Sequence, residues 1–411
     1  MNNLSPVYIA GVGAVSGAGG DVAATLDTFG SGQRNPAATL SFKTSITAPT
    51  FQVSAELPGL PGRFDSSRTL RLTMRALHEA LRDAGIEHCV PGTRVGVCLG
   101  TTVACQLNSI PFYDAYRRWR FCGDAGEANR ADRTDARPPA LDPIYDFLTA
   151  NLARAVSKLL DVTGPRMTVV NACSSGTDAI GVASTWIRAG LCDVAIAGGA
   201  DELNRVPVAG FWSLGVMSSE PCRPFDRDRT GLNLGEGAGI LVLESESHAR
   251  ARRRMNRFII AGFGAACDAH HLTAPHPDGR GLDASINTAL AQADIAPEQV
   301  AFINAHGTAT HDNDRTEAGV IARIFSDRVP FLSTKGYTGH TLGAAGGLEA
   351  VFSLLGLREG WVPANAGFAN APEEMPVVPV RERTTFTGDY ALSTSLAFGG
   401  NNAALIMRRI A

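Results

Sequence analysis

Two distant parts of the chain repeat each other, and this repeat limits the folds that the sequence can adopt. Residues 259–265 (Ile-Ile-Ala-Gly-Phe-Gly-Ala) echo residues 8–14 (Tyr-Ile-Ala-Gly-Val-Gly-Ala), and residues 289–295 echo residues 80–86. In each copy an apolar, strand-like run comes first and a helix-like run follows it. A duplicated βαβ unit explains this order, so the sequence predicts an α/β protein built from two related halves.

The repeat divides the chain into a half from residue 1 to 250 and a half from 251 to 411. A chain of 411 residues exceeds the usual size of one hydrophobic core, which also favours two lobes. The arginine-rich run at 250–254 indicates an exposed link between them. In each half the repeated unit is followed by a strand and a Gly-Thr pair, Gly100-Thr101 in the first and Gly307-Thr308 in the second.

Composition excludes several classes of protein. A net charge of −3 argues against a nucleic-acid binder, which would normally present a basic face. We find no apolar run of the roughly 18 residues that a membrane-spanning helix needs, and no positively charged signal segment at the N-terminus. A cytoplasmic protein is therefore expected. The eight cysteines include no Cys-x-x-Cys pair, which predicts reduced thiols without a metal.

Residues 169–183 of the first half predict a strand, a tight corner and a helix. The β-branched run behind Met167 is typical of a buried strand, Ser174 offers an N-cap oxygen and Gly190 a helix end. Cys173 then lies at the corner, where unpaired helix amides lower a thiol pKa and favour a nucleophile. The alternative interpretation is a small apolar residue packed under the helix.

Two histidines of the second half follow predicted strands in Gly-rich surroundings. His306 comes off the strand at 300–305, and His340 lies in the segment 335–347 behind the strand at 331–334. Ligands of α/β sheets bind at the carboxyl ends of strands. Each histidine alone is more often structural, but the pair, with Cys173 at the equivalent corner of the other half, predicts a shared site.

Such a set of groups suits carbon–carbon bond formation between thioesters. A thiolate can take an acyl group, and two imidazoles can stabilise an enolate formed by loss of CO2. No metal is required, and the residues near His306 lack a recognised ligand spacing. Lys335 is one of only three lysines, so a compact charge is expected to matter there; Glu349 on the following helix is a possible partner.

Ordered motifs along the chain resemble those of one family, the elongating β-ketoacyl-[acyl carrier protein] synthases, type II ketosynthases of the thiolase superfamily. The similarity runs from about residue 7 to 407 and is weakest at 30–65 and 104–142. The motifs are Asn171–Ser175, Pro221–Asp226, Gly235–Gly239, Asp268–Pro277, Asn304–Thr310, Lys335–Gly346 and Phe398–Asn402.

This resemblance implies the thiolase fold, with two duplicated halves in αβαβα layers, and a decarboxylative Claisen condensation. Cys173 would carry the acyl group as a thioester. His306 and His340 would bind malonyl thioester and promote decarboxylation. Lys335 would support them, with Glu349 as its partner. The product would be β-ketoacyl-acyl carrier protein in fatty acid, polyketide or aryl-polyene-type biosynthesis.

The resemblance also implies an oxyanion hole and a substrate channel. The main-chain amides of Cys173 and Phe398 would form the oxyanion hole, and Phe398 would gate the acyl pocket. Further substrate contacts are expected from Thr308, Thr310, Val103, Leu232 and Thr273.

The sequence departs from the family pattern beside Gly231. The family commonly has an aromatic residue after that glycine, whereas this chain has Leu232 and Asn233. Loss of a ring near the reaction centre predicts a reshaped pocket, for example for a polyene or aryl-ended chain.

No bound cofactor is expected, because phosphopantetheine would arrive on the acyl carrier protein. Arg68, Arg71 and Arg75 are candidates for docking that carrier, the alternative being an ordinary solvated helix. The family implies a homodimer, or a heterodimer with a chain-length-factor-like subunit. The alternative function is such a partner subunit, although Cys173 argues against a non-catalytic role. A thiolase would need a second late cysteine, and none follows Cys267.

Overall fold

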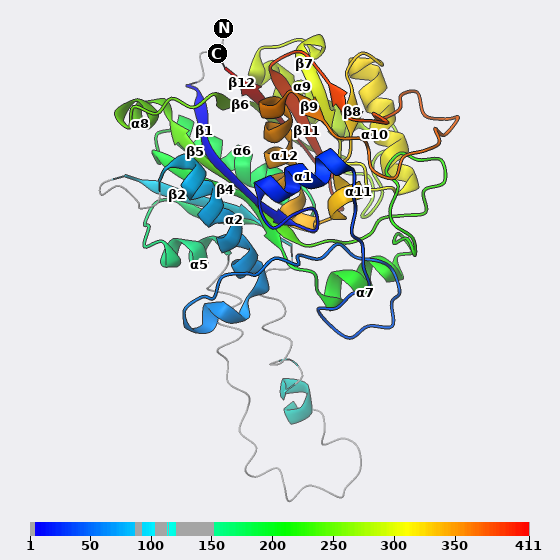
Figure 1. The fold of residues 1–411 in the computed structure, drawn as a ribbon, viewed down its shortest axis with the longest axis horizontal. Helices are drawn as coiled ribbons and strands as arrows, with labels where there is room; N and C mark the ends of the chain where they lie inside the picture. Colours follow the sequence, from blue (N-terminus) through cyan, green and yellow to red (C-terminus); the bar gives the residue numbers. More distant parts are fainter. Residues whose placement is uncertain (1–4, 87–92, 103–112, 114, 121–151, 411) are drawn as a thin grey trace, which may run out of the picture.

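The computed structural model describes residues 5–86, 93–102, 113, 115–120 and 152–410 (Figure 1). Ten of the strands in these residues form one large sheet, and a two-stranded ribbon accompanies it. The strands are β1 (Val7–Ser16), β2 (Val95–Gly100), β3 (Arg166–Val169), β4 (Val194–Asp201), β5 (Gly237–Ser245), β6 (Phe258–Cys267), β7 (Val300–Asn304), β8 (Phe331–Leu332), β9 (Trp361–Val362), β10 (Thr384–Thr385), β11 (Tyr390–Leu396) and β12 (Asn401–Arg409).

The strand order of the large sheet shows the predicted duplication. The order is β3-β2-β4-β5-β1 in the first half and, outward from the centre, β6-β12-β11-β7-β8 in the second. Read from each edge inward, both halves have two parallel strand pairings followed by two antiparallel pairings. Within the sheet, the two halves are joined where Val7 pairs with Ile260 and Tyr8 with Ile259. The thiolase-like α/β architecture is confirmed, whereas the boundary at residues 250 and 251 stays a prediction.

Helices cover both outer faces of the two half-sheets and fill the space between them. The helical segments are α1 (Val22–Ser31), η1 (Gly62–Ser66), α2 (Arg68–Ala84), α5 (Leu152–Leu159), α6 (Ser175–Arg188), α7 (Arg205–Ser213), α8 (Glu246–Ala251), α9 (Arg280–Ala293), η3 (Pro297–Gln299), α10 (His311–Phe325), α11 (Lys335–Thr338), η4 (Leu342–Ala344) and α12 (Ala345–Glu359). Figure 1 shows α12 near the centre, with α2 and α10 on opposite sides of it.

Three hydrophobic cores correspond to these layers. The central core joins α6 and α12 to strands of both halves. A second core packs α2 and α5 against the first half, and a third packs α9 and α10 against the second. The helices between the half-sheets are therefore buried on nearly all sides. In α12 the buried run extends from Ala345 to Leu357. The central layer can hold active groups away from water.

Local sequence signals explain most element ends. The sequence predicts a helix from about Arg68 to Ala84 with a serine cap, and this helix is α2: the side chain of Ser67 accepts a hydrogen bond from the Leu70 amide at 3.2 Å, and Gly85 ends the helix at φ 62°. The prediction of a buried strand behind Met167 is wrong. β3 lies at the edge of the sheet, and Met167 and Val170 are 46% and 68% exposed.

Other predictions concern the link between the halves and the segment before Cys173. Arg252 in the arginine run is not simply exposed, because its guanidinium pairs with the buried Glu244 at 3.0 Å. The sequence from Pro143 to about Leu160 predicts a helix, of which the structure describes α5. The polar, arginine-rich stretch from about 105 to 142 predicts an excursion on the surface, and it falls largely outside the described residues. Within the described part of the chain, no helix has the length and apolar character to cross a bilayer.

Candidate active site

The turn between β3 and α6 fixes Cys173 below the surface. The Asn171 amide donates to the Ser175 hydroxyl at 2.8 Å, and the Ser174 hydroxyl donates to Asp178 at 2.8 Å. Ala172 has φ 49°, a conformation that costs free energy for a residue with a side chain. These bonds stabilise the strained corner and leave the Cys173 side chain only 5% exposed at the start of α6.

Groups from the second half meet this sulfur. The His340 Nε2 atom lies 3.0 Å from the Cys173 Sγ atom, and the main-chain N–H of Phe398 donates to the same sulfur. Gly399 and Gly400, directly after Phe398, have φ 87° and 79°, which favour glycine and let the chain turn sharply there. The second half thus supplies an imidazole and an amide donor to a nucleophile of the first.

The second imidazole is oriented by a buried lysine. The rings of His306 and His340 lie 5.2 Å apart at 89°. The Lys335 ammonium donates to the His306 Nδ1 atom at 3.2 Å, to the His306 carbonyl at 2.6 Å and to the Glu349 carboxylate. These acceptors match its three N–H groups. Because Nδ1 accepts, the neutral His306 carries its proton on Nε2.

A further carboxylate, which the sequence did not reveal, holds the main chain at His306. Glu317 in α10 accepts from the His306 and Gly307 amides, each at 2.7 Å, and from the Thr394 hydroxyl at 2.7 Å. It is fully buried. A glutamate among charged neighbours in a helix ordinarily indicates an exposed position. Glu317 holds the main chain at His306 only because α10 packs its carboxylate against the Gly307 turn.

Burial controls the protonation of the site. It raises the pKa of Cys173 to about 12, against the pull of Lys335 and the Phe398 amide, so the expectation of a lowered thiol pKa is wrong. Burial, followed by the Lys335 charge, lowers the pKa of His306 and of His340 well below the usual value. The resting site therefore holds a thiol and two neutral imidazoles at neutral pH.

Glu349 shares this buried environment. Burial raises its pKa to about 7, and the neighbouring Lys335 ammonium opposes that rise. The predicted pairing of Lys335 with Glu349 is present in the structure. Both side chains lie behind His306 and form no part of the cavity wall.

A cavity of about 290 Å³ joins the sulfur and the imidazoles to the surface. It brings together most of the side chains that the sequence singled out. The predicted site residues in its wall are Cys173, Leu232, Thr273, His306, Thr308, Thr310, His340 and Phe398. The hydroxyls of Thr308 and Thr310 lie 2.9 Å apart. Their roles in substrate binding stay predictions.

The two departures from the family pattern face different ways. Leu232 lines the cavity, whereas Asn233 is fully buried and its side chain bonds to the main chain at Ser218, Glu220 and Cys222. Val103 lies outside the described residues. Phe211 of α7, which the sequence did not single out, also lines the cavity.

The Phe211 ring stacks on the Phe398 ring at 5.2 Å. The wall beside Phe398 is therefore aromatic in spite of the missing ring at position 232.

The three arginines considered for docking have partners within the chain. Arg68 binds the buried Glu236 at 2.6 Å. Arg71 donates to the Leu57 and Pro58 carbonyls, and Arg75 donates to the Gly20 carbonyl at 3.1 Å. These contacts favour the structural interpretation of this helix face.

Comparisons with known proteins agree with this geometry. The model of the β-ketoacyl synthase N-terminal domain matches residues 40–249, and that of the C-terminal domain matches residues 257–369. The chain belongs to the β-ketoacyl synthase family. The 3-oxoacyl-[acyl-carrier-protein] synthase 2 of Coxiella burnetii is 33% identical over 98% of each chain, and that of Staphylococcus aureus strain N315 is 31% identical over 100% of this chain and 99% of its own.

Solved β-ketoacyl synthase structures share the fold over nearly the whole length. The structure of the ishigamide ketosynthase/chain length factor has a TM-score of 0.87 at 28% identity, covering 99% of this chain and all of its own. A β-ketoacyl synthase from Burkholderia phymatum STM815 has a TM-score of 0.86 at 29% identity and the same coverage. The ketosynthase ApeO with its chain length factor ApeC, from Xenorhabdus doucetiae, has a TM-score of 0.80 at 32% identity, covering 100% of this chain and 99% of its own.

Proposed function

We propose that this β-ketoacyl synthase condenses an acyl thioester with malonyl-acyl carrier protein through an acyl-Cys173 intermediate. The observation that carries the proposal is the contact of 3.0 Å between the Cys173 sulfur and His340, with His306 in the same cavity. Two donor imidazoles and one nucleophile on a shared wall suit two successive thioester reactions.

The first reaction transfers the acyl group. The Cys173 sulfur attacks the thioester carbonyl, the bond from that carbonyl to the carrier sulfur breaks, and the proton from Cys173 passes to the carrier sulfur, which departs as a thiol. The contact with His340 suits either a thiol that donates to Nε2 or an Nε2–H that donates to a thiolate. The Phe398 amide stands beside the sulfur, where it would stabilise the oxyanion.

The second reaction uses the two imidazoles as donors. The Nε2–H of His306, whose tautomer Lys335 fixes, and the Nε2–H of His340 would bind the malonyl thioester oxygen. Loss of CO2 leaves an enolate whose charge these donors stabilise. Its carbon attacks the acyl-Cys173 carbonyl, the carbon–sulfur bond breaks, and β-ketoacyl-acyl carrier protein leaves.

A labelled acyl carrier tests the proposal. The purified protein should form one covalent acyl adduct that mass spectrometry places on Cys173, and Cys173→Ala should abolish it. Added malonyl carrier should release CO2 and consume the adduct. A protein that forms no adduct while Cys173 reacts with a small alkylating agent would instead support the chain-length partner as the function.

Leu232 in the cavity wall supports a specialised acyl group. The position lacks the ring that the family commonly has, while Phe211 and Phe398 keep a stacked aromatic wall nearby. We infer a preference for flat polyene or aryl-ended chains over saturated chains. Rates with saturated and aryl-polyene acyl carriers measure this directly, and Leu232→Phe should shift the preference toward saturated chains. Faster reaction of saturated chains with the natural protein would refute it.

A further inference from the structure

A buried aspartate that the reaction scheme does not use joins the two halves beside the active site. Asp201 ends β4 and is fully buried. One of its oxygens accepts from the Thr101 hydroxyl at 2.6 Å. The other accepts from the Thr102 hydroxyl at 2.7 Å and from the Gly343 amide at 2.7 Å. The Thr102 amide also donates to this carboxylate, at 2.9 Å. Each of these groups can donate to the carboxylate, which suits its ionised form.

Gly343 follows His340 by three residues, through a strained turn. Leu342 between them has φ 56°, in the left-handed region that residues with side chains avoid. The residue after Leu342 is Gly343, and its main-chain amide donates the hydrogen bond to Asp201. A carboxylate of the first half thus holds the end of the turn that carries the imidazole of the second half.

The surroundings of Gly343 leave little room for this turn to shift. A Cβ atom at Gly343 would lie 2.8 Å from the Thr101 main chain and 2.9 Å from the Asp201 carboxylate. The Gly343 carbonyl lies where a Cβ atom at Gly199 would stand, at 2.2 Å. Glycines let the main chains of the two halves touch here, and Asp201 supplies the polar link across the contact.

We propose that Asp201 is a positioning residue for the condensation, one that ties the Gly100-Thr101-Thr102 turn to the His340 turn. This inference rests on the proposed function, because it assigns a role within that reaction. It gives Asp201 two separable effects, one on the place of the His340 ring and one on the charge near the sulfur.

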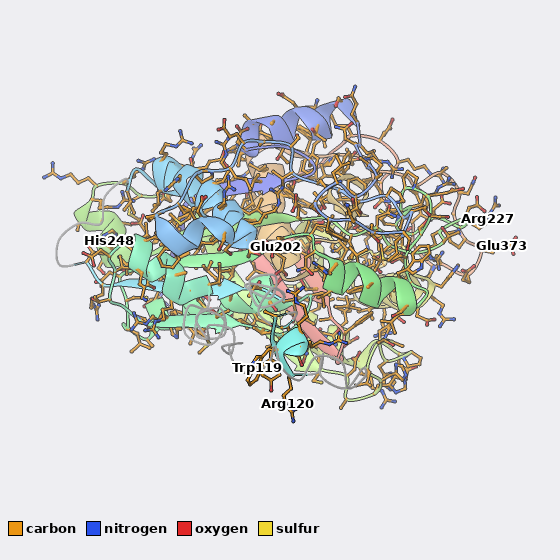
Figure 2. The ribbon with its side chains drawn as sticks, turned by 90° about the horizontal axis from the view of Figure 1, so that it is seen from below. Trp119, Arg120, Glu202, Arg227, His248 and Glu373 are labelled. Atoms are coloured by element: carbon orange, nitrogen blue, oxygen red, sulfur yellow. The ribbon has the colours of Figure 1, made fainter. Side chains whose placement is uncertain are left out.

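The charges that face Cys173 support the second effect. Burial is the largest cause of the raised pKa of the thiol; the charges of Asp201 and Glu349 add to it, whereas the Lys335 charge lowers it. His306 and His340 are neutral at neutral pH and add no charge. Glu202, the next residue after Asp201, is also buried, but its carboxylate accepts from the Thr69 amide at 3.1 Å. Figure 2 shows Glu202 near the centre of the molecule.

The test compares Asp201→Asn with Glu202→Gln in the full-length protein. Asp201→Asn removes the negative charge of the side chain. It also replaces one of the two acceptor oxygens with an NH2 group, which cannot accept a hydrogen bond. Iodoacetamide should therefore alkylate Cys173 faster at pH 8, since loss of the Asp201 charge lowers the pKa of the thiol and increases the thiolate fraction. The kcat for condensation should fall about tenfold or more, because the His340 ring is displaced, with KM for the malonyl carrier unchanged. Glu202→Gln should change neither rate.

Faster alkylation with slower condensation cannot come from partial unfolding alone if buried cysteines other than Cys173 stay unreactive. Equal changes in both variants, or unchanged condensation in Asp201→Asn, would overturn the proposal. If Asp201→Asn does not fold, Thr102→Val keeps the charge and removes one bond to it. This variant should slow condensation without faster alkylation, and normal condensation would then contradict the positioning role. Failure of the natural protein to form an acyl adduct would refute the proposed function instead.

Discussion

At the scale of single residues, the chemistry of the site depends on the three N–H groups of the Lys335 ammonium. They point to the His306 ring, the His306 carbonyl and the Glu349 carboxylate. This arrangement fixes the His306 tautomer and keeps a cation near Cys173 without placing it in the cavity. One buried lysine therefore orients the His306 ring, the donor in the proposed decarboxylation, and offsets part of the cost of a buried thiolate.

Lys335→Met should separate the two half-reactions. Without the ammonium, His306 Nδ1 has no donor and the Nε2 proton is no longer fixed. Decarboxylation of malonyl carrier should fall about 10²- to 10³-fold. Acylation of Cys173 should fall much less, because its attack does not need His306. Release of labelled CO2 and adduct formation measure the two steps. Glu349→Gln, which keeps an acceptor for Lys335, serves as control with a smaller loss, and equal losses in both steps of Lys335→Met would contradict the assignment.

The raised pKa of Cys173 predicts how its reactivity depends on pH. With a pKa of about 12, the thiol is protonated from neutral pH up to the alkaline limit of stability. The thiolate fraction, and with it the alkylation rate, should increase about tenfold per pH unit from pH 7 to 9 without a plateau. Lys335→Met should slow alkylation further, since removal of the cation raises the thiol pKa. Iodoacetamide kinetics in a Cys267→Ser background measure this. A plateau below about pH 8 would show a thiol already ionised in the resting enzyme.

At the scale of elements, glycines let helices cross strands at main-chain distance. At Gly100, the end of β2, a Cβ atom would lie 2.2 Å from the Ser175 main chain in the first turn of α6. Gly100→Ala should push that turn away and lower the free energy of unfolding by about 1–3 kcal/mol. Gly319→Ala in α10 is the control, because nothing lies within 4 Å of its Cβ position. It should leave stability unchanged or raise it by up to about 1 kcal/mol. Urea unfolding of both variants measures the difference, and equal stabilities would contradict the close packing.

Elements with local signals could be predicted from the sequence. α2 has a serine cap, an apolar face and a terminal glycine, and the repeat of residues 8–14 at 259–265 indicated the duplicated strands β1 and β6. The chemistry of Cys173, His306 and His340 was also accessible, because each follows a strand end in small-residue surroundings. Such patterns depend on near neighbours in the sequence.

Features set by long-range contacts could not be predicted in the same way. The run at β3 is as β-branched as a buried strand, and only the strand order shows that it lies at an edge. Asp201 and Glu317 carry no sequence signal, since their roles arise from amides far away in the chain. The pKa of Cys173 was misjudged for a related reason: the position beside α6 is local, whereas the burial that raises the pKa comes from the whole fold.

For the whole molecule, the duplication explains why the site lies between the halves. Equivalent turns follow the edge strands β3 and β8, and their helices α6 and α12 pack together in the central layer. The turn after β3 carries Cys173, and the turn after β8 carries His340. Because the two turns face each other, neither half alone contains a working site.

The edge strand β3 predicts how two such chains associate. Its outer side has no partner strand among the described residues, and Met167 and Val170 beside it are 46% and 68% exposed. An open edge with apolar neighbours is a ready surface for strand pairing, and a second copy pairing about a two-fold axis would close it. The natural protein should therefore have the mass of a dimer in light scattering. Val170→Asp should shift it toward the monomer, because the pairing would bring two carboxylates together.

Val378→Asp gives a matched control for this prediction. Val378 is 45% exposed, lies in the second half and does not border β3, so its substitution should leave the dimer intact. The β3 turn leads directly to Cys173, so the monomeric Val170→Asp protein should also form the acyl adduct more slowly. A Val170→Asp protein that keeps the dimer mass would show that the β3 edge is not the interface. If the natural protein is monomeric by itself, a mixed sample with a tagged second ketosynthase-like chain tests for a heterodimer through the same edge, which only Val170→Asp should abolish.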